Sequence, residues 1–289
     1  MRPSGGNIMK QDFDLHMHTT YCDGNNSAEE MILAAIDMGL KTVGISGHSF
    51  TWFDTSYCMS REDTGKYIRE IRRLKEKYAD RIRVLLGTEL DYWADIDTSP
   101  YDYLIGSSHY IISPSVLKDV HYMDVDYDAE TLMDGAMRFF NGDMARMAEA
   151  YYRQVGDIVR KTGCDIIGHF DLITKFNEQL PIQIVGTSDP VYVTAWMDAV
   201  DKIFEDTAAL RKSKPNRLEE LGVLTAGDKP VFEINTGAMA KGYRTTPYPA
   251  VDQIRYIMKK GGVLILSSDS HKTDTICYAF DEMEEWLQL

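Results

Sequence analysis

Short runs of apolar, β-branched residues alternate along this chain with longer segments in which apolar positions recur at helical spacing. The first five elements predicted from this pattern are a strand, a helix, a strand, a helix and a strand, at 12–18, 27–40, 42–48, 61–78 and 82–90. Ser27 followed by Glu30 is a capping box directly before an apolar helical run, and Gly39 stands where that helix is expected to end.

The same alternation continues to the end of the chain. Four more strands are predicted, at 102–110, 165–171, 230–237 and 261–270. The stretches between them read as helices, notably 128–163, 188–210 and 249–260. Seven strands separated by helices predict an α/β fold with a parallel sheet wrapped by helices. Periodicity alone is compatible with either a closed barrel or an open sheet.

Composition adds few restrictions to this fold. No repeat or linker divides the chain, so residues 1–289 are expected to form one domain with residues 1–10 as a flexible leader. The longest apolar stretches, such as 263–266, fall far short of the roughly 20 residues that cross a bilayer. The N-terminus also lacks the pattern of a targeting signal, so we expect a cytoplasmic protein without a membrane partner. The four cysteines are widely spaced, and we expect them to be reduced.

The charge balance favours small substrates over nucleic acid. The chain carries 31 basic and 45 acidic residues, a net charge of -14, which should repel a polyanionic backbone. A cluster of bound divalent ions would nevertheless make a pocket locally cationic. We therefore expect a small phosphorylated substrate and no nucleic-acid partner, while the oligomeric state stays open.

Histidines are concentrated at the ends of the predicted strands. Six of the seven stand at the C-terminal end of a strand, namely His16, His18, His48, His109, His169 and His271. Three carboxylates join them at the same edge, namely Asp23, Glu89 and Asp269. In a parallel barrel these strand ends converge on one mouth, where barrel enzymes keep their active sites.

This set of side chains predicts a metal site. His16 and His18 are two residues apart on a strand, so both imidazoles face the same side. Imidazole and carboxylate ligands without sulfur suit zinc, manganese or ferrous iron. His121 lies in a predicted loop, where a solvated histidine is more common than a ligand, and we leave it out of the set.

The order of these residues resembles the PHP superfamily, the polymerase and histidinol phosphatase domains, over essentially the whole chain. The matching segments are DLHMHTTYCDG, GISGHS, GTELDYW, IGSSHY, GHFDL and SSDSH. The resemblance implies a distorted seven-stranded (β/α)7 TIM-like barrel that binds two or three divalent ions.

The resemblance also implies a division of the ligands among three ions. One ion would take His16, His18, Glu89 and Asp269. A second would share Glu89 and add His109 and His169, and the third would take Asp23, His48 and His271.

Within the superfamily, the segment FEINTGAMAKGYRTTPYP is similar to the histidinol-phosphatase branch. The long insert between His109 and His169 points to the same branch rather than to the short modules attached to polymerases. The resemblance therefore implies a stand-alone phosphatase in histidine biosynthesis that hydrolyses L-histidinol phosphate to L-histidinol and inorganic phosphate.

The chemistry expected of such a site is attack by a metal-bridging hydroxide, since metal ions lower the pKa of bound water towards about 7. The residues that would hold this metal-bound hydroxide are Glu89, His16, His18 and Asp269. Three cations in loops on the same side could contact the phosphate: Arg244, Lys175 and Lys241. Arg244 is favoured because its planar fork suits bidentate recognition.

The acidic residues Asp119, Asp124, Asp126 and Asp128 of the loop 119–130 are candidates for meeting the cationic end of an amino-alcohol phosphate, although such a run is more often a solvated face.

Three other interpretations stay open on the sequence alone. A PHP phosphoesterase acting on another small phosphomonoester or a nucleotide would share the same metal chemistry. A metal-storing or regulatory protein could keep the ligands without turnover. Amidohydrolase chemistry is disfavoured, because such sites usually carry a metal-bridging lysine at the end of a middle strand, and no lysine stands there.

Overall fold

A computed structural model of the chain describes residues 11–112, 121–180 and 189–286. The predicted flexible leader, residues 1–10, lies outside the described residues, and the assignment of 1–289 to one domain stays a prediction. None of the helices in the described ranges combines the length and apolar content needed to cross a lipid bilayer.

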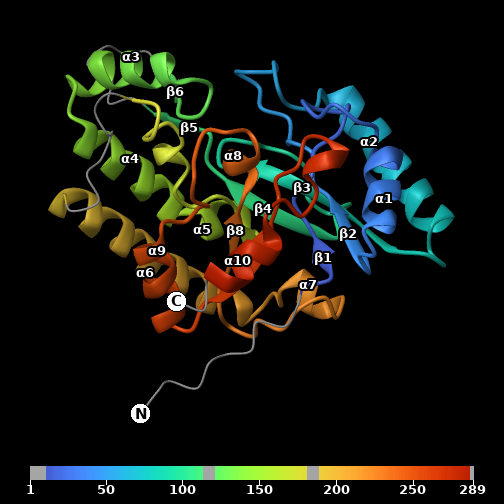
Figure 1. Ribbon diagram of the computed structural model, residues 1–289. Coiled ribbons are helices and arrows are strands. Elements are labelled where there is room, and N and C mark those ends of the chain that lie inside the picture. The colour runs from blue at the N-terminus through green and yellow to red at the C-terminus, as the bar shows by residue number, and fades with distance from the viewer. Residues whose placement is uncertain (1–10, 113–120, 181–188, 287–289) are drawn as a thin grey trace.

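A seven-stranded parallel sheet forms the centre of the molecule (Figure 1). In spatial order its strands are β1 (Phe13–Asp14), β2 (Thr42–Ile45), β3 (Arg83–Asp91), β4 (Tyr103–Ser107), β7 (Ile166–Ile167), β8 (Val231–Asn235) and β9 (Val263–Ser267). All six neighbouring pairs are parallel. The seven predicted strands are therefore confirmed, and they follow one another around the sheet in chain order.

The two edges of the sheet approach each other beyond β1 and β9. Met17 forms a parallel bridge with Ser270, and the amide of His18 donates to the carbonyl of Ser270 at 2.8 Å. The sheet is thus a nearly closed barrel, which decides between the two architectures that periodicity left open. Closure also places the first and last ligand segments side by side.

Helices surround the barrel (Figure 1). They are α1 (Ala28–Asp37), α2 (Arg61–Lys77), α3 (Ala129–Phe140), α4 (Met144–Gly156), α5 (Ile158–Thr162), α6 (Pro190–Arg211), α7 (Arg217–Glu220), α8 (Gly237–Ala240), α9 (Val251–Lys259) and α10 (Phe280–Trp286). Short 3-10 turns lie at η1 (Leu172–Thr174) and η2 (Thr273–Thr275). The predicted capping box of α1 is present, with Ser27 and Glu30 bonded reciprocally, and Gly39 follows the helix at a φ of 81°.

Between β4 and α3 the chain forms a two-stranded antiparallel hairpin that the sequence did not predict. β5 (Tyr110–Ile112) pairs with β6 (Tyr122–Asp124), and Tyr110 lies opposite Asp124. Prediction of a loop over 119–130 was therefore wrong for β6, because Met123 and Val125 alternate with polar neighbours and are buried. Asp119 lies outside the described residues, and Asp128 caps α3 by accepting from the amide of Thr131.

The interior of the barrel is filled below the strand ends. Tyr103 is fully buried there with apolar side chains of the neighbouring strands, and its hydroxyl donates to the carbonyl of Leu15. A Cβ at Gly44 or at Gly87 would come within 2.2 Å of the Tyr103 side chain. These glycines make room for the ring, which closes the floor beneath the histidines.

Candidate metal centre

All nine predicted ligands stand at or just beyond the C-terminal ends of the barrel strands. His16 and His18 follow β1, Asp23 lies in the turn after them, and His48 follows β2. Glu89 lies two residues before the end of β3. Four more follow later strands, namely His109, His169, Asp269 and His271.

Glu89 is the centre of this arrangement and has none of its side chain exposed. Five histidine rings surround its carboxylate. One oxygen, Oε2, lies 2.9 Å from His48, 3.2 Å from His16 and 3.4 Å from His18. The other, Oε1, lies 2.7 Å from His169 and 3.2 Å from His109. We call Glu89, His16, His109 and His169 the inner group.

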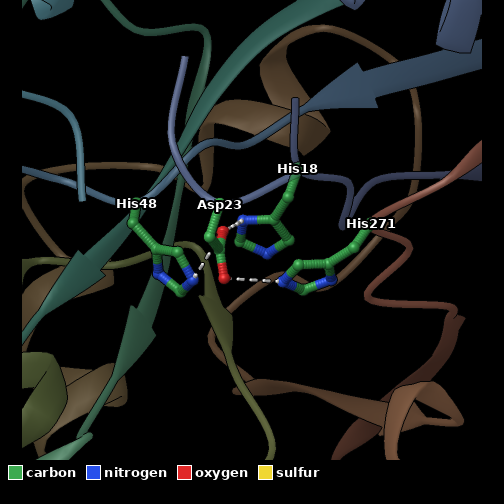
Figure 2. Close-up of side chains that lie close together, drawn as sticks. All are labelled: His18, Asp23, His48 and His271. Carbon is green, nitrogen blue, oxygen red and sulfur yellow. Dashed lines mark hydrogen bonds and ion pairs between the residues drawn. The ribbon is translucent and has the colours of Figure 1, made fainter. Parts of the chain in front are cut away.

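Four side chains form a second cluster nearer the rim, which we call the outer group: His18, Asp23, His48 and His271. Figure 2 shows the three histidines turned towards the carboxylate of Asp23. His271 Nε2 lies 3.1 Å from Asp23 Oδ2, and the nearest nitrogens of His48 and His18 lie 3.6 and 3.7 Å from Asp23 Oδ1. One ligand atom from each of the four can be chosen so that all lie within 4.8 Å of one another.

Asp269 lies between the two groups. Its Oδ1 is 3.1 Å from His18 Nε2 and 3.7 Å from His16 Nε2, and its backbone has a φ of 49°. The sets of atoms close enough to share an ion differ from the predicted division. Asp269 groups with His16 and His169, and His18 takes part in the outer group as well as beside Glu89. The nine residues are together, but their division among ions stays a prediction.

Two buried carboxylates behind the histidines were not predicted. Glu233 Oε2 accepts from His16 Nδ1 at 2.8 Å, and Asp91 Oδ2 accepts from His109 Nδ1 at 3.1 Å. An ionised carboxylate only accepts, so each contact places the proton on Nδ1 and leaves Nε2 free as a ligand. The sequence held a signal for both. Asp91 lies two residues beyond Glu89, and Glu233 interrupts an apolar strand.

Several buried polar atoms at the centre have no hydrogen-bond partner within the described part of the chain. They are His16 Nε2, His18 Nε2, His169 Nδ1 and Glu89 Oε2. Buried polar atoms are normally paired. Here the Nε2 atoms of His16 and His18 lie near carboxylate oxygens without the geometry of hydrogen bonds, which is the donor arrangement that a divalent cation fits.

The charges of the centre are strongly coupled. Burial lowers the pKa of His18 to about 3, helped by neighbouring His271 and His48, so His18 is neutral. Burial also acts to lower the pKa of His16, but the carboxylates of Glu233, Asp269 and Glu89 outweigh it and raise that pKa well above its usual value. The surrounding histidines hold the pKa of Glu89 well below its usual value despite its burial.

The inner and outer groups open into a cavity of about 360 Å³. Its lining also includes the cations Lys175 and Lys241, the carboxylates Asp124 and Asp126, and the aromatic rings of Tyr57 and Tyr110. A larger cavity of about 860 Å³ lies between α4 and α6, and none of the nine predicted ligands is in its described lining. The smaller cavity is therefore the candidate site, because predicted metal ligands line it.

The three predicted phosphate contacts are placed differently from one another. Lys175 Nζ donates to the backbone carbonyl of Asp126 at 2.7 Å, and Lys241 Nζ lies 3.4 Å from His271 Nε2. Arg244 is not in the described lining. Its guanidinium stacks on the ring of Tyr248, 4.4 Å from the centroid, and donates to Thr174. Arg244 thus supports the wall, and phosphate binding by any of the three stays a prediction.

Comparison with known proteins decides the family. The model of the PHP domain matches residues 14–210. The chain belongs to the PHP domain family. The resemblance found in the sequence is confirmed, and with it the distorted seven-stranded barrel.

Relatives of this PHP protein resemble it over nearly their full length. A protein of Deinococcus radiodurans named "probable histidinol-phosphatase" is 26% identical over 92% of this chain and 89% of its own. The histidinol-phosphatase of Bacillus subtilis is 25% identical over 95% of this chain and 99% of its own. The solved histidinol phosphate phosphatase of Lactococcus lactis, complexed with zinc, L-histidinol and phosphate, is 16% identical over 96% of this chain and 92% of its own, with a TM-score of 0.64. That last likeness shows the fold alone.

Proposed function

We propose that this PHP protein is a metal-dependent phosphomonoesterase that hydrolyses L-histidinol phosphate to L-histidinol and inorganic phosphate. The observation that carries the proposal is the convergence of six histidines and three carboxylates on one centre, of which four histidines and all three carboxylates line a single cavity. The names of the relatives from Deinococcus radiodurans and Bacillus subtilis support the substrate, as does the ligand set of the Lactococcus lactis structure.

The residues that would hold two or three divalent ions are those of the two groups together with Asp269. The unpaired nitrogens and carboxylate oxygens of the centre suit zinc, manganese or ferrous iron. Such ions would supply positive charge to the phosphoryl oxygens and lower the pKa of a bound water, so that water attacks phosphorus at neutral pH. The Nδ1 contacts from Glu233 and Asp91 would keep the ring nitrogens of His16 and His109 aimed at the centre.

The walls of the cavity match the two ends of an amino-alcohol phosphate. Lys241 brings positive charge to the cavity beside His271 Nε2, 3.4 Å away, where it could meet a phosphate. The charge of Lys175 in the same lining is balanced by Asp126 Oδ2 at 3.2 Å. Asp54, also in the lining, accepts from the hydroxyl of Tyr110 at 2.7 Å, and Asp124 is part of the same lining. Carboxylates beside aromatic rings suit an ammonium group and an imidazole ring. A nucleotide has no ammonium group to pair with these carboxylates.

A substrate panel with the zinc- or manganese-loaded enzyme tests the proposal. We expect kcat/KM for histidinol phosphate to exceed that for sugar phosphates and nucleotides by on the order of 100-fold, because paired polar groups discriminate strongly. A flat profile, or one that favours nucleotides, would replace the substrate but keep the chemistry. Failure to hydrolyse p-nitrophenyl phosphate with any of the three metals would refute the phosphatase itself.

A pair of histidine variants ties that activity to the centre. His18→Ala removes a ring that faces both groups, whereas His121→Ala changes an exposed histidine stacked on Phe139. We expect metal content and activity to fall in the first variant and to stay at the wild-type level in the second. A storage protein would bind metal without turnover in the wild-type protein and in His121→Ala.

A further inference from the structure

Tyr248 is a buried tyrosine whose hydroxyl forms no hydrogen bond that would stabilise the described part of the fold. The residue is 1% exposed, and its hydroxyl has no hydrogen-bond partner within the described ranges. The buried hydroxyl of Tyr101 is also unpaired there, but Tyr101 is not in the described lining of the metal cavity. Tyr67 behaves differently from both. The hydroxyl of Tyr67 donates to the carbonyls of Ile45 and Gly87 at 2.7 and 2.8 Å. An unpaired buried hydroxyl costs folding free energy, so its presence calls for a reason.

Tyr248 lies in the wall of the metal cavity. It is part of the same lining as His169, Asp269, Lys175 and Lys241. Its ring meets that of His169 edge to face, with 6.4 Å between the centroids. The unpaired hydroxyl is therefore beside the place where the substrate would react, rather than in a distant part of the core.

The ring of Tyr248 is fixed from several sides. Its backbone pairs with Asn235 at the end of β8, amide to carbonyl in both directions, at 2.8 and 3.0 Å. The guanidinium of Arg244 covers the ring face at 4.4 Å and is itself held by Thr174 and the carbonyl of Pro247. A ring held this way offers its hydroxyl in one position, which is what preorganised binding requires.

We propose that the Tyr248 hydroxyl is a catalytic residue that donates a hydrogen bond to a phosphoryl oxygen of the substrate. The proposal rests on the proposed function, because it needs a phosphate ester in this cavity. A phenol is protonated at neutral pH and can donate to an anionic oxygen. Arg244 on its ring and Lys241 in the same lining bring positive charge near Tyr248, which favours the phosphate end of the substrate over its ammonium end.

The test is Tyr248→Phe, which removes the hydroxyl and keeps the ring beneath Arg244. We expect kcat/KM to fall about 10- to 100-fold for both histidinol phosphate and p-nitrophenyl phosphate, somewhat less than for the strongest oxyanion donors. Inorganic phosphate, used as a competitive inhibitor and as a calorimetric ligand, should bind more weakly by a similar factor. Metal content should be unchanged, and the Tm should stay equal or rise, because the lost hydroxyl had no partner in the free protein.

Tyr67→Phe is the matched control. It also removes one buried tyrosine hydroxyl, but one that is paired with two carbonyls and lies outside the cavity lining. We expect its Tm to fall by a few degrees while its affinity for inorganic phosphate stays at the wild-type level.

Three results would overturn the assignment. Wild-type phosphate affinity in Tyr248→Phe would show that the hydroxyl does not contact phosphate. A fall in Tm as large as that of Tyr67→Phe would show that the hydroxyl is paired in the fold. A loss confined to histidinol phosphate would place the hydroxyl at the alcohol part of the substrate. If the wild-type protein hydrolyses neither ester, the proposed function fails first, and the role of Tyr248 falls with it.

Discussion

The inner and outer groups of the metal centre use the same two kinds of side chain in different surroundings. In the inner group, the side chains of Glu89 and His16 are 0% exposed, and a second buried carboxylate, Glu233, stands behind the histidine. In the outer group, the side chains of Asp23 and His271 are 33% and 14% exposed. His271 donates from Nδ1 to the backbone carbonyl of Asp269, at 2.9 Å, rather than to a carboxylate.

This difference separates a fixed end of the site from an adjustable one. A buried carboxylate among histidines is desolvated, so removing one partner leaves the others without compensation. Charges at the rim keep part of their water and lose less. We therefore expect the inner ions to be bound more tightly, and the outer ion to be the one that exchanges.

The largest effect should come from Glu89→Gln, because this change removes the negative charge that five histidine rings share. The amide keeps the shape of the side chain but is a poor metal ligand. We expect the loss of the inner ions and a fall in kcat/KM on the order of 1,000-fold or more. Metal analysis and p-nitrophenyl phosphate hydrolysis would measure both.

The control for this change is Glu130→Gln, an exposed carboxylate in the first turn of α3. It should bind metal and turn over as the wild-type protein does. If Glu89→Gln retains its ions and more than a tenth of its activity, the inner group is not the principal metal site.

The convergence of the nine candidate ligands could be predicted from the sequence because strand ends fix their position. Once a chain alternates strands with helices, a histidine at the end of any parallel strand reaches the same mouth. His109 and His169 are 60 residues apart, yet their ring centroids lie 5.1 Å from each other. That closeness follows from topology and needs no knowledge of side-chain packing.

What the sequence did not predict depends on side-chain paths. The partner behind His16 is Glu233, which is 217 residues away in the chain, and nothing local to either residue indicates the pairing. Arg244 shows the same limit in reverse. Its loop is on the expected side, but the packing of its guanidinium on Tyr248 and its hydrogen bond to Thr174 could not be read from the sequence. Closure of the barrel likewise depends on a bridge, Met17 to Ser270, that periodicity does not reveal.

An intermediate effect is expected from Glu233→Gln. The carboxylate accepts from His16 Nδ1, from the amide of His169 and from Asn235 Nδ2. An amide offers only one acceptor oxygen. At least one of the three donors would therefore face the NH2 group of the glutamine instead of an acceptor. Loss of such an orienting partner typically costs 10- to 100-fold in metal affinity or activity, and we expect about that.

Zinc titration monitored by competition with a chelator would measure the affinity of each class of site in Glu233→Gln. The weakening should appear in the tight class alone, since the contacts of Glu233 among the described residues are to His16, His169 and Asn235 and not to the outer group. Equal weakening of both classes would argue against a separate support for the inner group.

The smallest effect should come from Asp23→Asn, which changes the carboxylate that the outer histidines share. Asp23 is one third exposed, and its contacts with His48 and His18 are 3.6 and 3.7 Å long, so the neighbours can rehydrate or turn. We expect about one metal ion per chain to be lost, the others to remain, and kcat/KM to fall roughly 10-fold, at the low end for loss of a metal-site carboxylate. Metal stoichiometry after dialysis separates this outcome from general failure of the centre. Loss of every ion, or a fall in activity as large as in Glu89→Gln, would mean that the two groups act as one cooperative site and that burial does not divide them.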